Sequence, residues 1–380
     1  MSTSGLATPP VRLLTLLLVM AAVAGACSFP GSGTAKSSSP AASSARTSSH
    51  SASASPSPSL NPSPAPLTSS FGVLVSTLSS SSYTVSLVGI DGRVIASGIA
   101  NTPGAVTCGT AAAGLVPPPV STSDSRVYFM DALGVVRFLG PNGDTGQVAT
   151  LPIGPARRSL FAVSPDGTAM SVVVLDFTAT GATTRLYFYD LQPGGAQNLV
   201  FTQSGAFTLW PIGWHGPTNL VLATVPACTQ GGGFGCCGPQ ELHVVDPKTA
   251  VRRFVIGGNG CLISGPPSPG GVSCETSGSS DMVYSWSNQL LRTYPIPGVG
   301  EGPVYLSPNG QHLALSTNTN ETTVEGGQTL SMNVCGWIDD THILAGGDAQ
   351  NQPRIGDVTS GNIVPVAAQG DCAGRIPGGL

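Results

Sequence analysis

The sequence predicts an all-β domain over residues 71–380. Gly and Pro together exceed a fifth of the 380 residues, whereas charged residues make up only 9%. This composition favours frequent tight turns. From Phe71 onward, short β-rich runs alternate with clusters of Gly, Pro, Asn and Asp, and the runs lack the 3.6-residue periodicity of an amphipathic helix. The domain is therefore expected to consist of short strands joined by turns.

The N-terminal segment has the pattern of an export signal. The basic residue Arg12 precedes an apolar run, residues 13–26, that is too short to span a bilayer comfortably. The run ends in the sequence AGAC at Cys27, which resembles the lipobox of bacterial lipoproteins. The resemblance implies that residues 1–26 are a lipoprotein signal peptide and that the Cys27 thiol carries the lipid. Two acyl chains anchor a protein stably.

An ordinary secretory signal remains the alternative, because Val23 stands where the lipobox pattern has Leu. In both cases the protein is expected to leave the cytoplasm. With the lipid attached, it is expected on the extracytoplasmic face of the cell membrane.

Residues 27–70 are predicted to be a disordered tether. Ser, Pro, Ala and Thr dominate this segment, so it cannot bury a core. Held in polyproline II, it would reach on the order of 130 Å from the membrane. Such linkers are typical of lipoproteins from high-GC Gram-positive bacteria, so the segment resembles an actinobacterial-type lipoprotein tether.

A repeated corner organises the folded part. Residues 161–167 (FAVSPDG) and 304–310 (VYLSPNG) each precede a second apolar run. Pro presets φ for the first turn position, and Asp-Gly or Asn-Gly supplies the positive φ that closes a hairpin. This strand, turn and strand unit resembles the inner hairpin of WD40-like and TolB-like β-propeller blades.

Weaker versions of the corner recur at about 40 to 50 residues, with one shorter interval, as expected for four-stranded blades. They lie at residues 120–124, 213–217, 266–270 and 336–340. A second signature looks like the hairpin between the third and fourth strands of a blade. It occurs at residues 187–194, 244–249 and 355–361.

The domain begins without an inner strand and has one unassigned strand near residues 372–379. We expect this strand to pair beside residues 71–76 and to close the ring, which leaves no open sheet edge there. Six corners and this composite blade predict a seven-bladed β-propeller. A six-bladed ring is the alternative, because the interval from Pro308 to Asp339 is barely long enough for a blade.

The cysteines predict disulfides rather than a metal site. Apart from Cys27, the chain has eight, and an exported chain with an even number of cysteines favours disulfide bonds. No C-x-x-C pair typical of a zinc site occurs. The candidates are Cys108, Cys228, Cys236, Cys237, Cys261, Cys274, Cys335 and Cys372. We expect Cys261 to pair with Cys274 and Cys228 with Cys236 or Cys237. The other three are expected to link neighbouring blades.

The remaining motifs have simple structural interpretations. The glycine-rich segment 229–238 lacks the Lys-Ser/Thr of a phosphate-binding loop, so it is expected to be an insertion. Asp339 and Asp340 are interpreted as turn residues rather than as a cation site. Trp214 and Trp337 occupy the apolar slot of their corners, which favours packing between blades over sugar binding. The histidines of the domain are expected to be structural, and neither a metal nor a cofactor is expected. These are His215, His243, His312 and His342.

Two functions remain open. The first is a non-enzymatic module that binds an envelope protein or a cell-wall ligand, which is favoured because no recognisable catalytic motif occurs. The second is an extracellular hydrolase or lyase that acts on carbohydrate, for which a pair of carboxylates facing a pocket would be required. Nucleic acid is an unsuitable partner, because 15 basic residues face 19 acidic ones.

Overall fold

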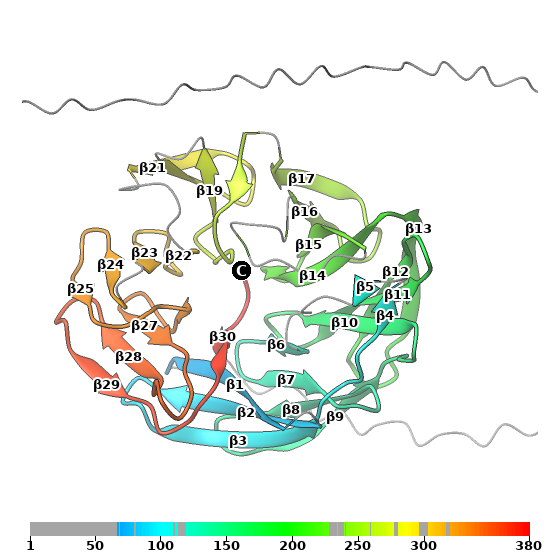
Figure 1. Cartoon of the computed structure of the whole chain (residues 1–380). Helices are drawn as coiled ribbons and strands as arrows, with labels where there is room; N and C mark the ends of the chain where they lie inside the picture. Colours follow the sequence, from blue (N-terminus) through cyan, green and yellow to red (C-terminus); the bar gives the residue numbers. More distant parts are fainter. Residues whose placement is uncertain are drawn as a thin grey trace, which may run out of the picture. The chain divides into compact units, whose positions relative to one another are not determined.

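The structure is a computed structural model that describes residues 67, 69–79, 81–108, 111–112, 119–227, 234, 239, 241–258, 260–276, 280–295, 303–316 and 320–380. Every regular element in these ranges is a β-strand. Within the same ranges, no helix has the length and apolarity needed to cross a membrane. Seven four-stranded antiparallel sheets stand around a central axis (Figure 1). The protein is a seven-bladed β-propeller, as predicted, and the six-bladed alternative is wrong.

Blades 2 to 4 follow one another along the chain. Each consists of four consecutive strands, and its innermost strand runs into one of the predicted corners. Blade 2 comprises β6 (Val120–Thr122), β7 (Val127–Met130), β8 (Val135–Leu139) and β9 (Thr145–Thr150); blade 3 comprises β10 (Arg157–Val163), β11 (Ala169–Phe177), β12 (Ala182–Asp190) and β13 (Gln197–Gly205); blade 4 comprises β14 (Phe207–His215), β15 (Asn219–Pro226), β16 (Glu241–Val245) and β17 (Arg252–Gly257).

Blades 5 to 7 repeat this order with shorter strands. Blade 5 comprises β18 (Leu262–Ile263), β19 (Val272–Thr276), β20 (Ser280–Tyr284) and β21 (Leu290–Pro295); blade 6 comprises β22 (Val304–Leu306), β23 (Leu313–Ser316), β24 (Thr322–Val324) and β25 (Thr329–Leu330); blade 7 comprises β26 (Gly336–Trp337), β27 (His342–Ala345), β28 (Arg354–Asp357) and β29 (Ile363–Pro365). The strands of blade 6 have only two to four residues. These short strands explain how a complete blade fits into the short sequence interval.

Blade 1 joins the two ends of the domain. It contains β1 (Phe71–Ser79), β2 (Ser82–Gly89), β3 (Val94–Asn101) and, as its innermost strand, β30 (Asp371–Ile376). β30 lies antiparallel to β1, with Phe71 opposite Ile376 and Val75 opposite Asp371. The predicted ring closure is therefore confirmed. An additional hairpin of β4 (Thr107–Cys108) and β5 (Ala111–Ala112) precedes blade 2 and was not expected from the sequence.

The strongest corners have the expected turn geometry. In blade 3 the Gly167 amide donates to the Ser164 carbonyl, and Gly167 has a φ of 69°. In blade 6 the Gly310 amide donates to the Ser307 carbonyl, and Gly310 has a φ of 71°. A left-handed conformation is open to glycine at little steric cost, so both SPDG and SPNG close as hairpins.

The apolar core lies between blades rather than within one layer. The buried residues form seven clusters, and each cluster joins two neighbouring blades. Side chains alternate along a strand, so one strand serves two interfaces. In β1, for example, Val73 packs toward blade 2 and Leu74 packs toward blade 7.

Two disulfides join described cysteines. Cys261 is bonded to Cys274 across the corner of blade 5, which is the predicted pair. Cys335, just before β26, is bonded to Cys372 in β30, so this disulfide links blade 7 to blade 1. Cys108 lies in β4. Cys27, Cys228, Cys236 and Cys237 lie outside the described residues, as do residues 27–66 of the predicted tether and most of segment 229–238. Leu67, near the end of the predicted tether, packs against the cluster between blades 1 and 2.

Candidate functional site

A cavity of about 310 Å³ lies in the central channel. Its walls come from the innermost strands of six blades and from the corner of blade 5. Proline and aromatic side chains recur in the lining. They include Pro211, Trp214, Pro266, Pro267, Tyr305 and Trp337. A concave, mostly apolar site with a small number of polar groups is typical of ligand binding.

Arg375 supplies the charged side chain among the described residues that line this cavity. The β30 ladder holds Arg375 opposite Gly72, so ring closure determines its position. Within the part of the chain that the structure describes, its guanidinium forms no hydrogen bond or ion pair. Burial lowers the pKa of Arg375, and the charges of Asp340, Asp124 and Asp339 offset this effect only in part. The group nevertheless stays charged, because the pKa of arginine is very high.

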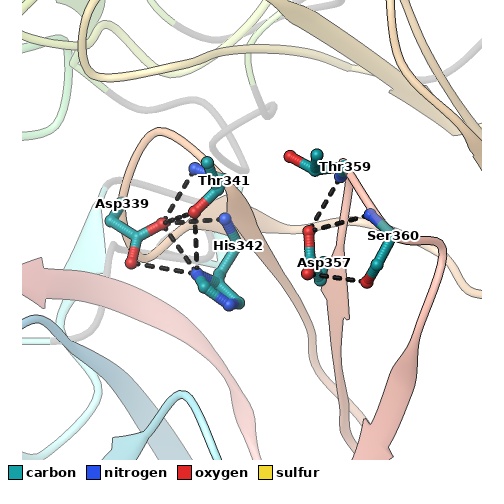
Figure 2. A network of polar contacts seen from close by, with 6 residues as sticks. All are labelled: Asp339, Thr341, His342, Asp357, Thr359 and Ser360. Atoms are coloured by element: carbon teal, nitrogen blue, oxygen red, sulfur yellow. Dashed lines mark hydrogen bonds and ion pairs between the residues drawn. The ribbon is translucent and has the colours of Figure 1, made fainter.

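Asp339 and Asp340 act as turn residues, as predicted. Asp339 accepts hydrogen bonds from the backbone amides of Thr341 and His342, each at 2.8 Å, and from the Thr341 hydroxyl (Figure 2). Asp340 accepts a hydrogen bond of 2.8 Å from the Asn309 amide, which ties the corners of blades 6 and 7 together. Both carboxylates thus form hydrogen bonds that stabilise the corners of blades 6 and 7.

His342 forms a hydrogen bond with the Asp339 carboxylate of this turn. The Nδ1 atom of His342 lies 2.9 Å and 3.0 Å from the two carboxylate oxygens of Asp339. This hydrogen bond raises the pKa of His342. Burial alone would raise the pKa of Asp339, but the hydrogen bonds from His342 and Thr341 outweigh it and lower that pKa. Asp339 therefore stays ionised near neutral pH and is poorly suited to donate a proton.

The outer turn of blade 7 is closed in the same way. Asp357 accepts hydrogen bonds from the amide of Thr359 at 2.8 Å and from the hydroxyl of Ser360 at 2.6 Å (Figure 2). These bonds lower the pKa of Asp357. Asp357 is also the cross-strand partner of His342. The two carboxylates in Figure 2 thus stabilise two turns of one blade.

The corner tryptophans pack between blades, as predicted. The Trp214 indole is 1% exposed and donates a hydrogen bond of 3.0 Å to the Ala162 carbonyl in blade 3. The Trp337 indole donates one of 2.9 Å to the Tyr305 carbonyl in blade 6. Each indole therefore bonds to the inner strand of the preceding blade. Such buried N–H groups need an acceptor, and the neighbouring blade provides it.

The other three histidines of the domain each contact a different kind of group. His215 stacks on Trp286, with ring centroids 5.1 Å apart, and its Nδ1 atom lies 2.5 Å from the main-chain oxygen of Leu380. His243 lies 3.1 Å from a carboxylate oxygen of Glu241. His312 bonds to the main-chain oxygen of Glu325. No group of three or more His, Cys, Asp or Glu able to hold a metal occurs among the described residues.

Residues 377–380 enter the channel after β30. The Gly378 amide donates to the Ser123 carbonyl at 2.9 Å, and the Leu380 amide donates to the Trp214 carbonyl at 2.7 Å. In Figure 1 this end of the chain lies at the centre of the ring. The segment thus forms part of the cavity wall, to which Gly379 and Leu380 both contribute.

A second concave surface, of about 570 Å³, lies between blades 1 and 7. Its lining near the β1–β2 and β27–β28 connections combines hydroxyl and amide side chains with the carboxylate of Asp348 and small apolar residues. The hydroxyl and amide groups include those of Ser76, Thr84, Gln352 and Gln369. Antiparallel strands alternate in direction, so these connections lie at the opposite end of the channel from the corners. This groove is a useful reference surface for experiments on the channel.

Sequence reasoning missed the two features that define the channel. Arg375 is a single arginine in the last strand, and no motif surrounds it. The entry of residues 377–380 depends on ring closure, so it becomes visible only in three dimensions. The available signal was the unusual run IPGGL, whose adjacent glycines permit a close approach to other backbone.

Comparisons with known proteins add no family to this description. No protein-family model matches the chain, and no curated protein matches it significantly.

Proposed function

We propose that the protein is a lipid-anchored binding module on the extracytoplasmic face of the cell membrane, and that it takes its ligand in the central channel. The observation that carries this proposal is the guanidinium of Arg375, which has no hydrogen bond or ion pair within the described residues and lines a cavity rich in proline and aromatic side chains. The lining also includes the hydroxyls of Ser121, Thr122 and Ser268. Burial of this charge is unfavourable, and the charges of Asp340, Asp124 and Asp339 offset the cost only in part. An acceptor on a ligand would relieve this cost, so Arg375 is the polar anchor of the proposed site.

The lining favours binding over catalysis. Glycoside hydrolysis uses two carboxyl groups facing the substrate. The described residues of the lining include neither Asp nor Glu. A permanently charged guanidinium binds acceptors well but cannot act as a general base. We therefore favour a partner from the cell envelope, a protein or a cell-wall ligand, over the hydrolase or lyase alternative.

The role of the channel in ligand binding can be tested by comparing one substitution in the cavity with one in the reference groove. Wild-type protein, Arg375→Gln and Gln369→Ala are immobilised and exposed to solubilised envelope from the producing bacterium. Bound molecules are then quantified by mass spectrometry. We expect Arg375→Gln to reduce retention of the specific ligand by about tenfold or more, because a hydrogen bond to a charged group contributes roughly 1.5–3 kcal/mol. Gln369→Ala alters only the reference groove and should retain the ligand. Equal retention by all three proteins would exclude the channel as the site.

Anchoring is tested separately at Cys27. Cys27→Ala is expected to move the protein from the membrane fraction to the medium or to leave it unprocessed, because the thiol that accepts the lipid is gone. Partition into detergent and the mass of the mature N-terminus report both outcomes. Ser28→Ala is the matched control and should behave as the parent. A Cys27→Ala protein that still partitions into detergent would contradict lipidation at this residue.

A further inference from the structure

We propose that the channel mouth beside Trp214 binds a peptide segment in which two glycines precede a leucine-sized apolar residue. This ligand class rests on the proposed function of the channel. In the structure, residues 378–380 of the chain itself occupy this site. The partner is thus a protein that presents such a segment.

The first step is recognition of the peptide backbone. The Gly378 amide donates to the Ser123 carbonyl at the corner of blade 2, and the Leu380 amide donates to the Trp214 carbonyl in β14 of blade 4. The segment is therefore held by main-chain carbonyls of two blades. Main-chain hydrogen bonds supply affinity in peptide recognition, while pockets for side chains supply specificity.

The second step is the pocket for the apolar side chain. Leu380 packs beside β14 and contacts the cluster between blades 4 and 5. A Cβ atom at Gly213 would lie 2.9 Å from Cγ and Cδ1 of Leu380, so glycine at this position creates the space. A bulge between Pro211 and Gly213 re-aims the strand at the same point. The pocket therefore depends on one residue that can be blocked by substitution.

The third step is selection for glycine. A Cβ atom on Gly378 would lie 2.6 Å from the Thr122 hydroxyl oxygen and 2.7 Å from the Thr122 carbonyl carbon. Gly379 has a φ of 85°, and a Cβ atom there would lie 3.0 Å from Pro165. Both positions thus disfavour any larger residue, one through close contact and the other mainly through backbone conformation.

The fourth step is orientation of the bound backbone. The Nδ1 atom of His215 meets the main-chain oxygen of Leu380 at 2.5 Å. The His215 ring is stacked on Trp286 with an interplanar angle of 23°. The Trp286 indole is in turn fixed by a 3.0 Å hydrogen bond to the Ser268 carbonyl. A histidine held in this way is a preformed partner for a peptide oxygen.

The chain's own segment is a competitor for the site. It makes two backbone hydrogen bonds and one to His215, and it is tethered directly to β30. A tethered segment competes with an effective concentration of about millimolar. A partner peptide gains access when it displaces residues 378–380 or when they are released.

The test uses the full chain and a fluorescent peptide, acetyl-Ile-Pro-Gly-Gly-Leu. In Gly378→Ala/Gly379→Ala, the chain's own segment is excluded and the site is open. We expect this variant to bind the peptide at least about tenfold more tightly than the wild type, because the tethered competitor is lost. Adding Gly213→Val should abolish binding. A peptide with alanines in place of both glycines should not bind.

Controls separate this proposal from misfolding and from the proposed function. Cooperative thermal unfolding of each variant shows that the ring is intact. If the double variant does not fold, deletion of residues 378–380 replaces it, since this change removes the competing segment and leaves every strand unchanged. Equal peptide affinity of wild type and opened variant, or equal binding of the alanine peptide, would overturn the proposal. If retention of an envelope ligand still depends on Arg375 in that case, the channel function stands and only the peptide class fails.

Discussion

Deleting residues 372–380 is expected to produce a protein that aggregates and melts far below the full-length chain. The deletion removes nearly all of β30 and leaves β1 with an unpaired edge toward the channel. It also removes Ile376, which is fully buried between blades 1 and 2, and the Cys372 end of the disulfide to blade 7. Exposed strand edges and apolar faces promote association between chains.

The size of this effect follows from the individual losses. Loss of a large buried aliphatic side chain costs about 2–5 kcal/mol. Loss of a disulfide costs about 2–4 kcal/mol. Together they approach the total stability of an ordinary domain, about 5–15 kcal/mol. Thermal unfolding and size-exclusion chromatography measure the outcome.

A shorter deletion is the matched control. Removing residues 378–380 leaves the β30 ladder and the Cys335–Cys372 disulfide in place. We expect a smaller decrease in melting temperature, because only the hydrogen bonds of Gly378 and Leu380 and the packing of the Leu380 side chain are lost. If the nine-residue deletion stayed soluble and melted within about 2 °C of the parent, which corresponds to about 1 kcal/mol or less for a domain of this size, closure by β30 would not stabilise the ring.

The architecture was predictable because local turn chemistry repeats along the chain. The corners at residues 161–167 and 304–310 contain Pro and Gly where a hairpin needs a fixed φ and a positive φ. Their spacing then implies the number of blades. The fourth strand of blade 1 was predictable because a domain that starts in mid-blade needs a strand from elsewhere to cover its edge.

Other features depend on contacts between distant residues. Pairing of Cys335 with Cys372 requires the ring to close first, so sequence spacing alone could suggest only a link between blades. The role of Arg375 depends on six other blades that enclose its strand. Burial of Asp281 has the same origin. In its strand, SDMVY, the polar residue would be expected to face water, yet the neighbouring blade covers that face.

Asp281 lies in β20 and is fully buried. Its face of blade 5 packs toward blade 6, as shown by Val283 on the same face of the strand. Neither carboxylate oxygen has a hydrogen-bond partner of ordinary geometry among the described residues, and the same holds for the buried hydroxyls of Ser264 and Ser273. Glu275 is the cross-strand partner of Asp281. Within the described residues, this buried acid therefore forms no ion pair and lies opposite another acid.

Burial raises the pKa of Asp281 to about 6; the charge of Glu275 adds to this effect, and the nearby Ser264 hydroxyl reduces it. The folded state therefore holds a proton that the unfolded chain releases near pH 3.8, the ordinary value. Below pH 3.8 the Asp281 carboxyl is protonated in both states and does not reduce the free energy of unfolding. As the pH rises from about 3.8 to about 6, the free energy of unfolding falls, and it then levels off after a total loss of about 3 kcal/mol.

Asp281→Asn removes the ionisable proton while keeping nearly the same shape. We expect this variant to be more stable than the parent by up to about 3 kcal/mol at pH 7 to 8, and to lose that advantage near pH 4, where the parent carboxyl is also neutral. Denaturant unfolding at several pH values measures the difference between the two proteins. Glu275→Gln is the partial control, since it removes only the repulsion and should give a smaller gain over the same pH range. An Asp281→Asn advantage that did not change between pH 4 and pH 8 would show that ionisation of this carboxyl does not destabilise the interface between blades 5 and 6.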